Sequence, residues 1–268
     1  MRATALMAAN VFRESVRDKV LYNLVFFAVL LIVASYLIGQ LTAGQDIKII
    51  KDLGLAATSV FGLFIAVFIG IGLVSKEVER RSIYALLAKP IERHQIVIGK
   101  YVGVVLTLAV NLSVMAAALY LVLAYMRWVS PENVVRALEA PALDPAMLNA
   151  VGLIFVELAI VTAIALFFST FSTPILSATL TFGLFVAGHF SGDLRNFDQV
   201  VASPVAVRLA RALYWVLPNL APFDVKAQVV HGQPVPAGYL ALTTAYGVVY
   251  IAVLLTAAVL IFSRRDFR

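Results

Sequence analysis

Residues 101–126 read YVGVVLTLAVNLSVMAAALYLVLAYM, a run without a single Asp, Glu, Lys or Arg. A helix of about 20 apolar residues crosses the roughly 30 Å hydrocarbon core of a bilayer. Lipid offers no hydrogen bonds to the backbone, so such a run crosses it as a helix. Four further stretches lack the same charged residues: 20–45, 53–75, 158–192 and 227–263. The pattern predicts an all-α integral membrane protein.

The composition of the chain supports this prediction. Of its 268 residues, 62% are hydrophobic and 13% are charged, against about 45–50% and about 25% in soluble domains. The chain contains no cysteine, which excludes a disulfide framework, a thiolate metal site and a cysteine nucleophile. We find no linker or soluble domain boundary, and we expect one transmembrane domain over residues 1–268.

The run over 158–192 is too long for one span and has to be divided. The residue before a proline avoids helical geometry, so the polar sequence STFSTP at residues 169–174 predicts a break there. Six transmembrane helices are therefore predicted, over residues 21–43, 53–75, 98–126, 147–169, 174–190 and 239–262.

Three segments lie outside these spans. Residues 1–19 are predicted to form an amphipathic helix at the membrane interface, because polar residues from Asn10 onward recur at helical spacing opposite Phe12 and Val16. Residues 76–94 form a loop with a short amphipathic helix, which either enters a groove on a soluble partner or folds back on the membrane interface. Residues 191–238 form a segment on the opposite side of the membrane.

Basic residues predict the orientation. Six spans place both termini on one side, and that side carries 13 Lys and Arg residues against 8 on the other. Cytoplasmic segments are enriched in Lys and Arg. We therefore expect both termini and the 76–94 loop in the cytoplasm, and residues 191–238 outside it.

Glu157 is the one acidic residue deep inside a predicted span, where a charge costs about 2.5 kcal/mol or more. It is expected to face protein or water. We favour a structural hydrogen bond to a neighbouring helix or a second copy over a substrate or proton role, with Asn111 as a candidate partner. His94, His189 and His231 are far apart in sequence, and neither metal-ligand spacing nor a nucleotide-binding motif occurs. The sequence predicts no metal site and no catalysis by this chain.

Small residues recur at four-residue spacing in two spans. Gly62, Ala66 and Gly70 form one stripe, and Gly99 and Gly103 form a G-x-x-x-G motif. Small residues let helix backbones approach closely. Both stripes are predicted to pack against other helices.

Several motifs resemble the permease subunit of a type-2 ABC transporter, the class of drug, polysaccharide and nitrous-oxide-reductase maturation permeases. Among these groups, the chain looks most like the permeases for nitrous-oxide-reductase and multi-copper enzyme maturation. The motifs are FRESVRDK at 12–19, KEVERRSIYALLAKPI at 76–91, GKY at 99–101, FSTFS at 168–172, LPNLAPFD at 217–224 and RRDF at 264–267.

The resemblance implies that the 76–94 loop docks on a separate cytoplasmic ATPase, which holds the ATP and Mg, and that residues 1–19 are a membrane elbow. It also implies a second permease copy or a homologous permease, a cell membrane location, lipid contact and no nucleic acid. Export is the usual direction of transport in this class. The residues that it places at the ATPase interface are Glu77, Glu79, Arg80, Arg81, Ile83, Leu86, Leu87, Lys89, Pro90 and Arg93.

Two other functions compete with this one. A secondary transporter driven by an ion gradient would use Glu157 as its proton or cation site. An intramembrane hydrolase needs a nucleophile beside a base, whereas the sequence offers scattered serines and separate histidines.

Overall fold

The computed structural model describes residues 2–17, 19–40, 46–79, 93–130, 141–192 and 217–264, with single positions between 205 and 214. No strand occurs in these stretches. The elements are α1 (Arg2–Val16), α2 (Lys19–Gln40), α3 (Asp46–Glu79), α5 (Arg93–Val129), α7 (Ala146–Ser169), α8 (Pro174–His189), the 3-10 turn η2 (Ala221–Phe223), α11 (Lys226–Val230) and α12 (Ala237–Arg264).

Five of these helices are long and apolar enough to cross a membrane: α2, α3, α5, α7 and α12. The sixth predicted span, α8, is apolar but has only 16 residues. The prediction of an all-α integral membrane protein is confirmed, with five long spans and one short one.

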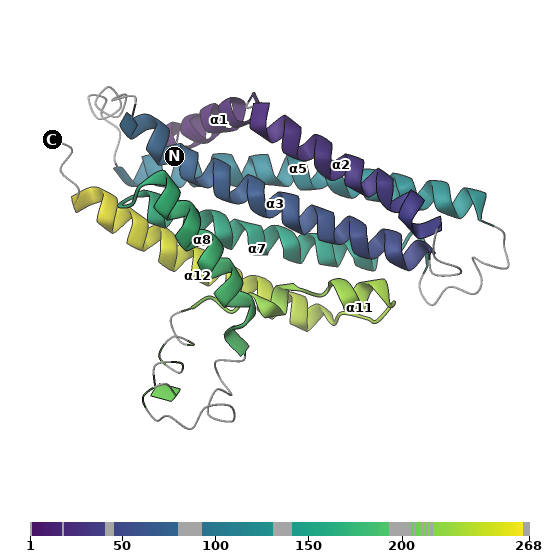
Figure 1. The fold of residues 1–268 in the computed structure, drawn as a ribbon. Helices are drawn as coiled ribbons and strands as arrows, with labels where there is room; N and C mark the ends of the chain where they lie inside the picture. The colour runs from purple at the N-terminus through teal and green to yellow at the C-terminus, as the bar shows by residue number, and fades with distance from the viewer. Residues whose placement is uncertain are drawn as a thin grey trace.

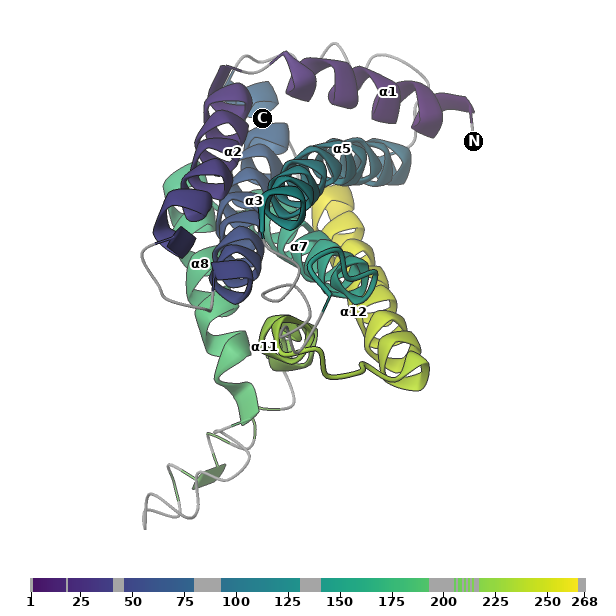
Figure 2. The same cartoon turned by 90° about the vertical axis from the view of Figure 1, so that its right-hand side faces the viewer.

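The long helices run side by side in an elongated bundle (Figure 1). Its first end, at the left of that view, holds α1, the last turns of α3 and α12 and the first turn of α5. Its far end holds the end of α5 and the start of α7. Viewed along the bundle in Figure 2, α8 and α12 diverge, with α11 between them.

Two helices extend well beyond their predicted bounds. α3 has 34 residues, and α5 has 37, where the sequence predicted 53–75 and 98–126. The predicted spans were drawn to end at charged residues. A charged residue leaves the lipid but does not interrupt backbone hydrogen bonds, so the helix continues into the interface.

The amphipathic α1 crosses α5 at the first end of the bundle (Figure 2). The G-x-x-x-G motif of α5 lies under this crossing. A Cβ atom built at Gly103 would stand 2.7 Å from Val11 Cβ and 2.8 Å from the Ala8 carbonyl oxygen. At Gly99 it would stand 2.8 Å from Met7 Cβ. The two glycines therefore admit the backbone of α1, and this contact leaves no room for a side chain.

The stripe on α3 faces α7. Ala66 is fully buried, and a Cβ atom at Gly62 would stand 2.4 Å from a methyl carbon of Leu158. At Gly70 it would stand 3.0 Å from Ala165 Cβ. α7 contacts α3, α5, α8 and α12, and it is therefore the central helix of the bundle.

A buried lysine fastens the far end. Lys51 of α3 is 1% exposed, and its Nζ donates to the Pro141 carbonyl oxygen at 2.7 Å. The Tyr120 hydroxyl donates to the Asp144 carbonyl oxygen at 2.8 Å, and Asp144 Oδ1 accepts from the Ala146 amide at the start of α7. α3, α5 and α7 are thus connected through one short polar segment.

Candidate functional site

The short α8 brings an ionisable side chain to the middle of α7. Pro174 stands at the start of α8, where its fixed φ and missing N–H suit the first turn of a helix. The helix ends at His189 after 16 residues, about 24 Å at about 1.5 Å per residue. Its end therefore lies beside Glu157, at the midpoint of the 24-residue α7.

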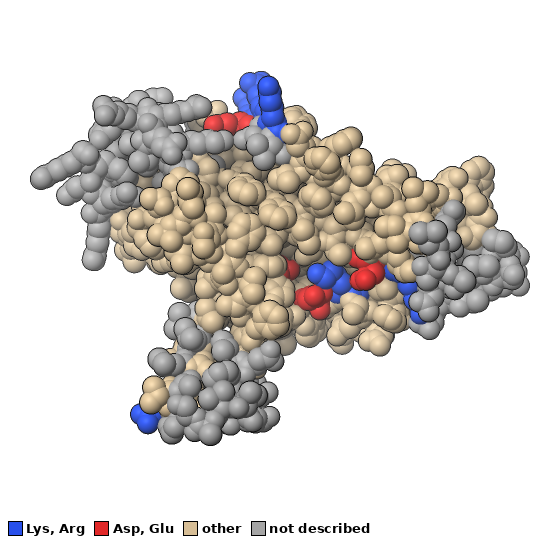
Figure 3. Space-filling model, viewed as in Figure 1, with Lys and Arg blue, Asp and Glu red and all other residues tan. Residues whose placement is uncertain are grey.

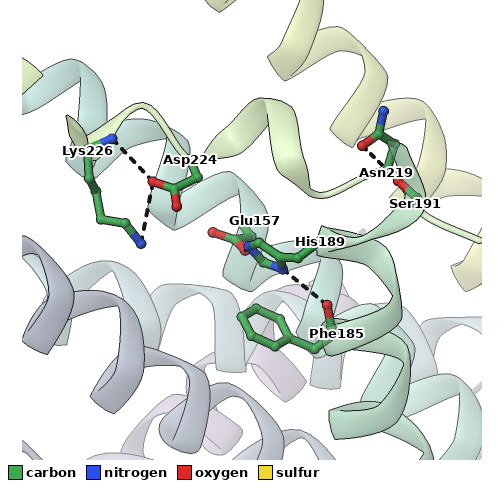
Figure 4. A network of polar contacts seen from close by, with 7 residues as sticks. All are labelled: Glu157, Phe185, His189, Ser191, Asn219, Asp224 and Lys226. Atoms are coloured by element: carbon green, nitrogen blue, oxygen red, sulfur yellow. Dashed lines mark hydrogen bonds and ion pairs between the residues drawn. The ribbon is translucent and has the colours of Figure 1, made fainter. Parts of the chain in front are cut away.

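Glu157 and His189 form the centre of a polar cluster (Figure 4). Glu157 is 1% exposed, and its Oε1 lies 3.1 Å from His189 Nε2. This buried oxygen has no hydrogen-bond partner among the described residues. The other ring nitrogen, Nδ1, lies 3.1 Å from the Phe185 carbonyl oxygen. The two side chains therefore join α7 and α8 at ion-pair distance.

A second ion pair borders this centre. Lys226 Nζ lies 3.6 Å from Asp224 Oδ1, and the same oxygen accepts from the Lys226 amide at 3.3 Å. Asp224 ends the η2 turn, on the side of the cluster away from α8 (Figure 4). The cluster therefore contains two carboxylates, one ammonium group and one imidazole.

Residues 217–230, called here the outer segment, cover the cluster. Their apolar side chains fill the space beside α7 and α3, and four of them are at most 1% exposed: Leu220, Phe223, Val225 and Val229. The sequence predicted only an extracytoplasmic segment over 191–238, and the structure packs this part of it into the bundle.

Backbone and side-chain hydrogen bonds join the outer segment to α8. The Leu220 amide donates to the Gly188 carbonyl oxygen at 3.0 Å, and Ser191 Oγ donates to Asn219 Oδ1 at 2.9 Å. Gly188 has no room for a side chain, because a Cβ atom there would stand 2.9 Å from the Pro218 carbonyl oxygen. The end of α8 and the start of the outer segment therefore form one structural unit.

Two tyrosines of α12 hold the opposite side of the outer segment. The Asn219 amide donates to the Tyr246 hydroxyl at 2.9 Å, and the Tyr239 hydroxyl donates to the Pro222 carbonyl oxygen at 2.6 Å. α8, the outer segment and α12 are thus linked in a chain of polar contacts that closes over Glu157.

On the face seen in Figure 3, charged side chains gather beside this unit, whereas the rest of the described bundle surface is mostly uncharged. In Figure 3, Lys, Arg, Asp and Glu gather in a band beside α11 and α3 and in a patch near the end of α1. The broad surface between them carries neither sign of charge. A band of charges that leads toward mid-bundle is the expected signature of a water-accessible face.

The predicted ATPase interface falls mostly outside the described residues. Glu77 and Glu79 occupy the last turn of α3, and Arg93 is the first residue of α5. The remaining seven, which the structure leaves undescribed, are Arg80, Arg81, Ile83, Leu86, Leu87, Lys89 and Pro90.

Glu157 is buried among protein in the structure, and Asn111, the candidate partner from the sequence, bonds elsewhere. Asn111 Nδ2 donates within its own helix, to the Thr107 carbonyl oxygen at 2.7 Å. The partner of Glu157 is His189, which sequence reasoning set aside because it lacked a neighbour at metal-ligand spacing. A signal was present, since His189 follows directly after an apolar run, at a depth where an ionisable group needs a partner.

The cluster can bind protons and cations, and hold helices together. No group of three or more His, Asp or Glu side chains in the described part of the chain is arranged to hold a metal ion. The ammonium group and a protonated imidazole together balance the two carboxylates, so the cluster has no net charge when His189 is protonated.

Comparison with known proteins identifies the family. The model of the ABC-2 family transporter proteins matches residues 6–267. No curated protein matches the chain. The match covers every spanning helix, the 76–94 loop and the outer segment. The chain therefore belongs to the ABC-2 family of transporter proteins, as a multi-pass membrane permease subunit of an ABC transporter.

Proposed function

We propose that this permease works as part of an ATP-driven exporter, with a separate cytoplasmic ATPase that carries the ATP and Mg. The observation that carries the proposal is the family match over nearly the whole chain. The geometry of the first end agrees with it, because the 80–92 segment is flanked by α3 and α5, the two longest helices. We place this segment on the ATPase.

Movement of the 80–92 segment would reach the far end of the bundle through these helices. α3 and α5 each exceed about 50 Å in length, at about 1.5 Å rise per residue, and both contact α7 along the way. α1 lies against α5 at the two glycines. α1, at the membrane interface, therefore holds the first turns of α5, which is one of the two helices that would transmit this movement.

The permease is proposed to function with a second permease, either an identical or a homologous one, in the cell membrane. Large apolar side chains stand exposed along α2 and α12, including Phe26 and Leu37 on the first and Leu242 and Val249 on the second. Lipid and a second permease are the environments that suit such faces.

A negative charge on the apolar side of the predicted helix in the 76–94 loop tests the coupling assignment. Leu86→Asp or Leu87→Asp should release the ATPase or uncouple its hydrolysis from transport, because a carboxylate cannot enter an apolar groove. The matched control is Leu148→Asp, at the exposed far end of the bundle, which should leave ATPase binding unchanged. Equal recovery of ATPase and equal transport for both loop variants would remove the assignment.

The orientation has its own test, since the natural chain contains no cysteine. An impermeant maleimide added outside intact cells should label Ser130→Cys, which follows α5 at the far end. It should not label Ser82→Cys until the membrane is opened. The reverse pattern would place both termini outside.

A further inference from the structure

Both ring nitrogens of His189 face oxygen atoms. Nδ1 lies 3.1 Å from the Phe185 carbonyl oxygen, and Nε2 lies 3.1 Å from Glu157 Oε1. A carbonyl oxygen only accepts hydrogen bonds, so the proton of that contact belongs to Nδ1. At the other nitrogen, an unprotonated Nε2 and an ionised carboxylate oxygen at this distance would repel each other, because both atoms carry negative charge. The geometry therefore favours a second proton in the contact between Nε2 and Glu157.

The same geometry indicates how many protons the pair of His189 and Glu157 holds. A neutral imidazole has one ring proton, and the contact with Phe185 uses it. The contact between His189 and Glu157 therefore contains one proton more than a neutral imidazole and an ionised carboxylate hold. The result is the same whichever of the two groups carries the extra proton.

The surrounding charges also favour one extra proton in the contact between His189 and Glu157. Glu157 of α7 and Asp224 of the outer segment are the described charged groups that act on the imidazole, and Lys226 already pairs with Asp224. On α12, the Tyr246 hydroxyl is engaged with the backbone of the outer segment. On α3, the described charged side chains belong to the first two turns of the helix, toward the far end of the bundle: Lys48, Lys51 and Asp52. Among the groups that act on the ring, one positive charge is required to balance Glu157, and the extra proton supplies it.

The position of the pair gives this proton a mechanical role. His189 is the last residue of α8, and Gly188 before it and Ser191 after it are both bound to the outer segment. Glu157 belongs to α7, the buried centre of the bundle. His189 is 26% exposed, and the partly exposed charged pair Asp224 and Lys226 beside it indicates that this side of the bundle is open to water and its protons.

We propose that Glu157 and His189 form a proton-binding site, in which one bound proton fastens the end of α8 and the outer segment to the middle of α7. Loss of this proton releases them. The proposal does not depend on the identity of the ATPase or of the substrate.

The sign of the pH dependence follows from the proton count. Separated and solvated, imidazole gives up its second proton near pH ~6.5 and a glutamic acid near ~4.3. Above about pH 7 the released pair therefore holds no extra proton, and fastening takes up one from solution. The ratio of fastened to released molecules should fall by up to about tenfold for each unit of rising pH.

Two spin labels would measure this ratio on the full chain in lipid nanodiscs. Gly152→Cys on α7 and Gly192→Cys beyond α8 are suitable positions, because a Cβ atom meets nothing within 4 Å at either one. Double electron–electron resonance should show one distance at pH 6.0 and a second, longer one that grows by pH 8.5. An identical distance distribution at both pH values would overturn the proposal.

Two conservative variants separate proton binding from a merely structural contact. In Glu157→Gln the amide donates to the Nε2 lone pair of a neutral imidazole, and in His189→Gln the amide donates to the carboxylate. Both contacts form without an extra proton, so both variants should keep the short distance from pH 6.0 to 8.5. His189→Ala should show the long distance throughout. A pH shift that persists in both Gln variants would assign the proton to another group and refute the proposal.

Discussion

Two joints of the permease are held together by different interactions, one at the first end of the bundle and one beside the middle of α7. At the first end, α1 lies on α5 where Gly99 and Gly103 admit its backbone, and the contact has no space for a side chain. At the junction of α7, α8 and the outer segment, hydrogen bonds and the Glu157–His189 contact do the joining. The first joint depends on shape, and the second depends on polar pairing.

The two joints should therefore differ in how easily they open. A close-packed joint loses many small dispersion contacts at once when it opens, so its helices move together. A polar joint opens by exchanging a few hydrogen bonds for water, each with a net value of about 1 kcal/mol. We expect α1 and α5 to move as one body, and α8 with the outer segment to separate from α7.

Overfilling the shape-dependent joint should have the largest effect. Gly103→Leu places a side chain against Val11 and the Ala8 carbonyl, which is backbone and cannot move aside. We expect a loss of about 2–3 kcal/mol in stability, measured by unfolding in lipid micelles. Gly183→Leu on α8 is the control, because its Cβ meets nothing within 4 Å. Equal stability of both variants would mean that α1 is only loosely attached.

Removing the carboxylate should have a smaller effect. Glu157→Leu leaves the half-buried His189 without its partner, at an expected cost of about 1–2 kcal/mol. Glu157→Gln retains a hydrogen-bonding group of the same size and should stay close to the natural stability. The comparison of the two by chemical unfolding separates polar pairing from packing. A Leu variant more stable than the Gln variant would show that the pair contributes nothing to holding α8.

The smallest effect is expected at the α12 side of the outer segment. Tyr246→Phe removes the acceptor of the Asn219 amide, with an expected loss of about 0.5–1 kcal/mol. Hydrogen exchange should report it as faster exchange confined to residues 219–224. The control is Tyr22→Phe, an exposed tyrosine of α2. Unchanged exchange would show that α12 does not hold this segment.

The spans were readable from the sequence because lipid imposes a simple rule on composition. The stretch 101–126 lacks charges because it must lie in hydrocarbon, and α5 does contain it. The full reach of α5 to Arg93 was not readable, since charged residues in the interface are compatible with both helix and loop. The burial of Leu220 and Phe223 was missed for a related reason, because a short apolar motif between prolines does not reveal what it packs on.

Partners across helices were the other gap. Glycine spacing predicted close packing at Gly99 and Gly103, but spacing on one helix does not identify the helix opposite, which is α1. Glu157 and His189 are 32 positions apart in sequence, and only the length of α8 brings them to one depth. The length of α8, which begins at Pro174, therefore produces a contact that no local sequence pattern predicts.

The brevity of α8 also affects the lipid around it. An apolar helix of about 24 Å is shorter than the roughly 30 Å hydrocarbon core, so adjacent lipids have to thin the bilayer or let water enter beside His189. Membrane thickness then acts on the permease directly. Lipids with shorter acyl chains would relieve this deformation, and longer chains would increase it, at a fraction of a kcal/mol per Å. The acyl-chain length of the host membrane thus becomes a physical variable that biases the conformation of this permease.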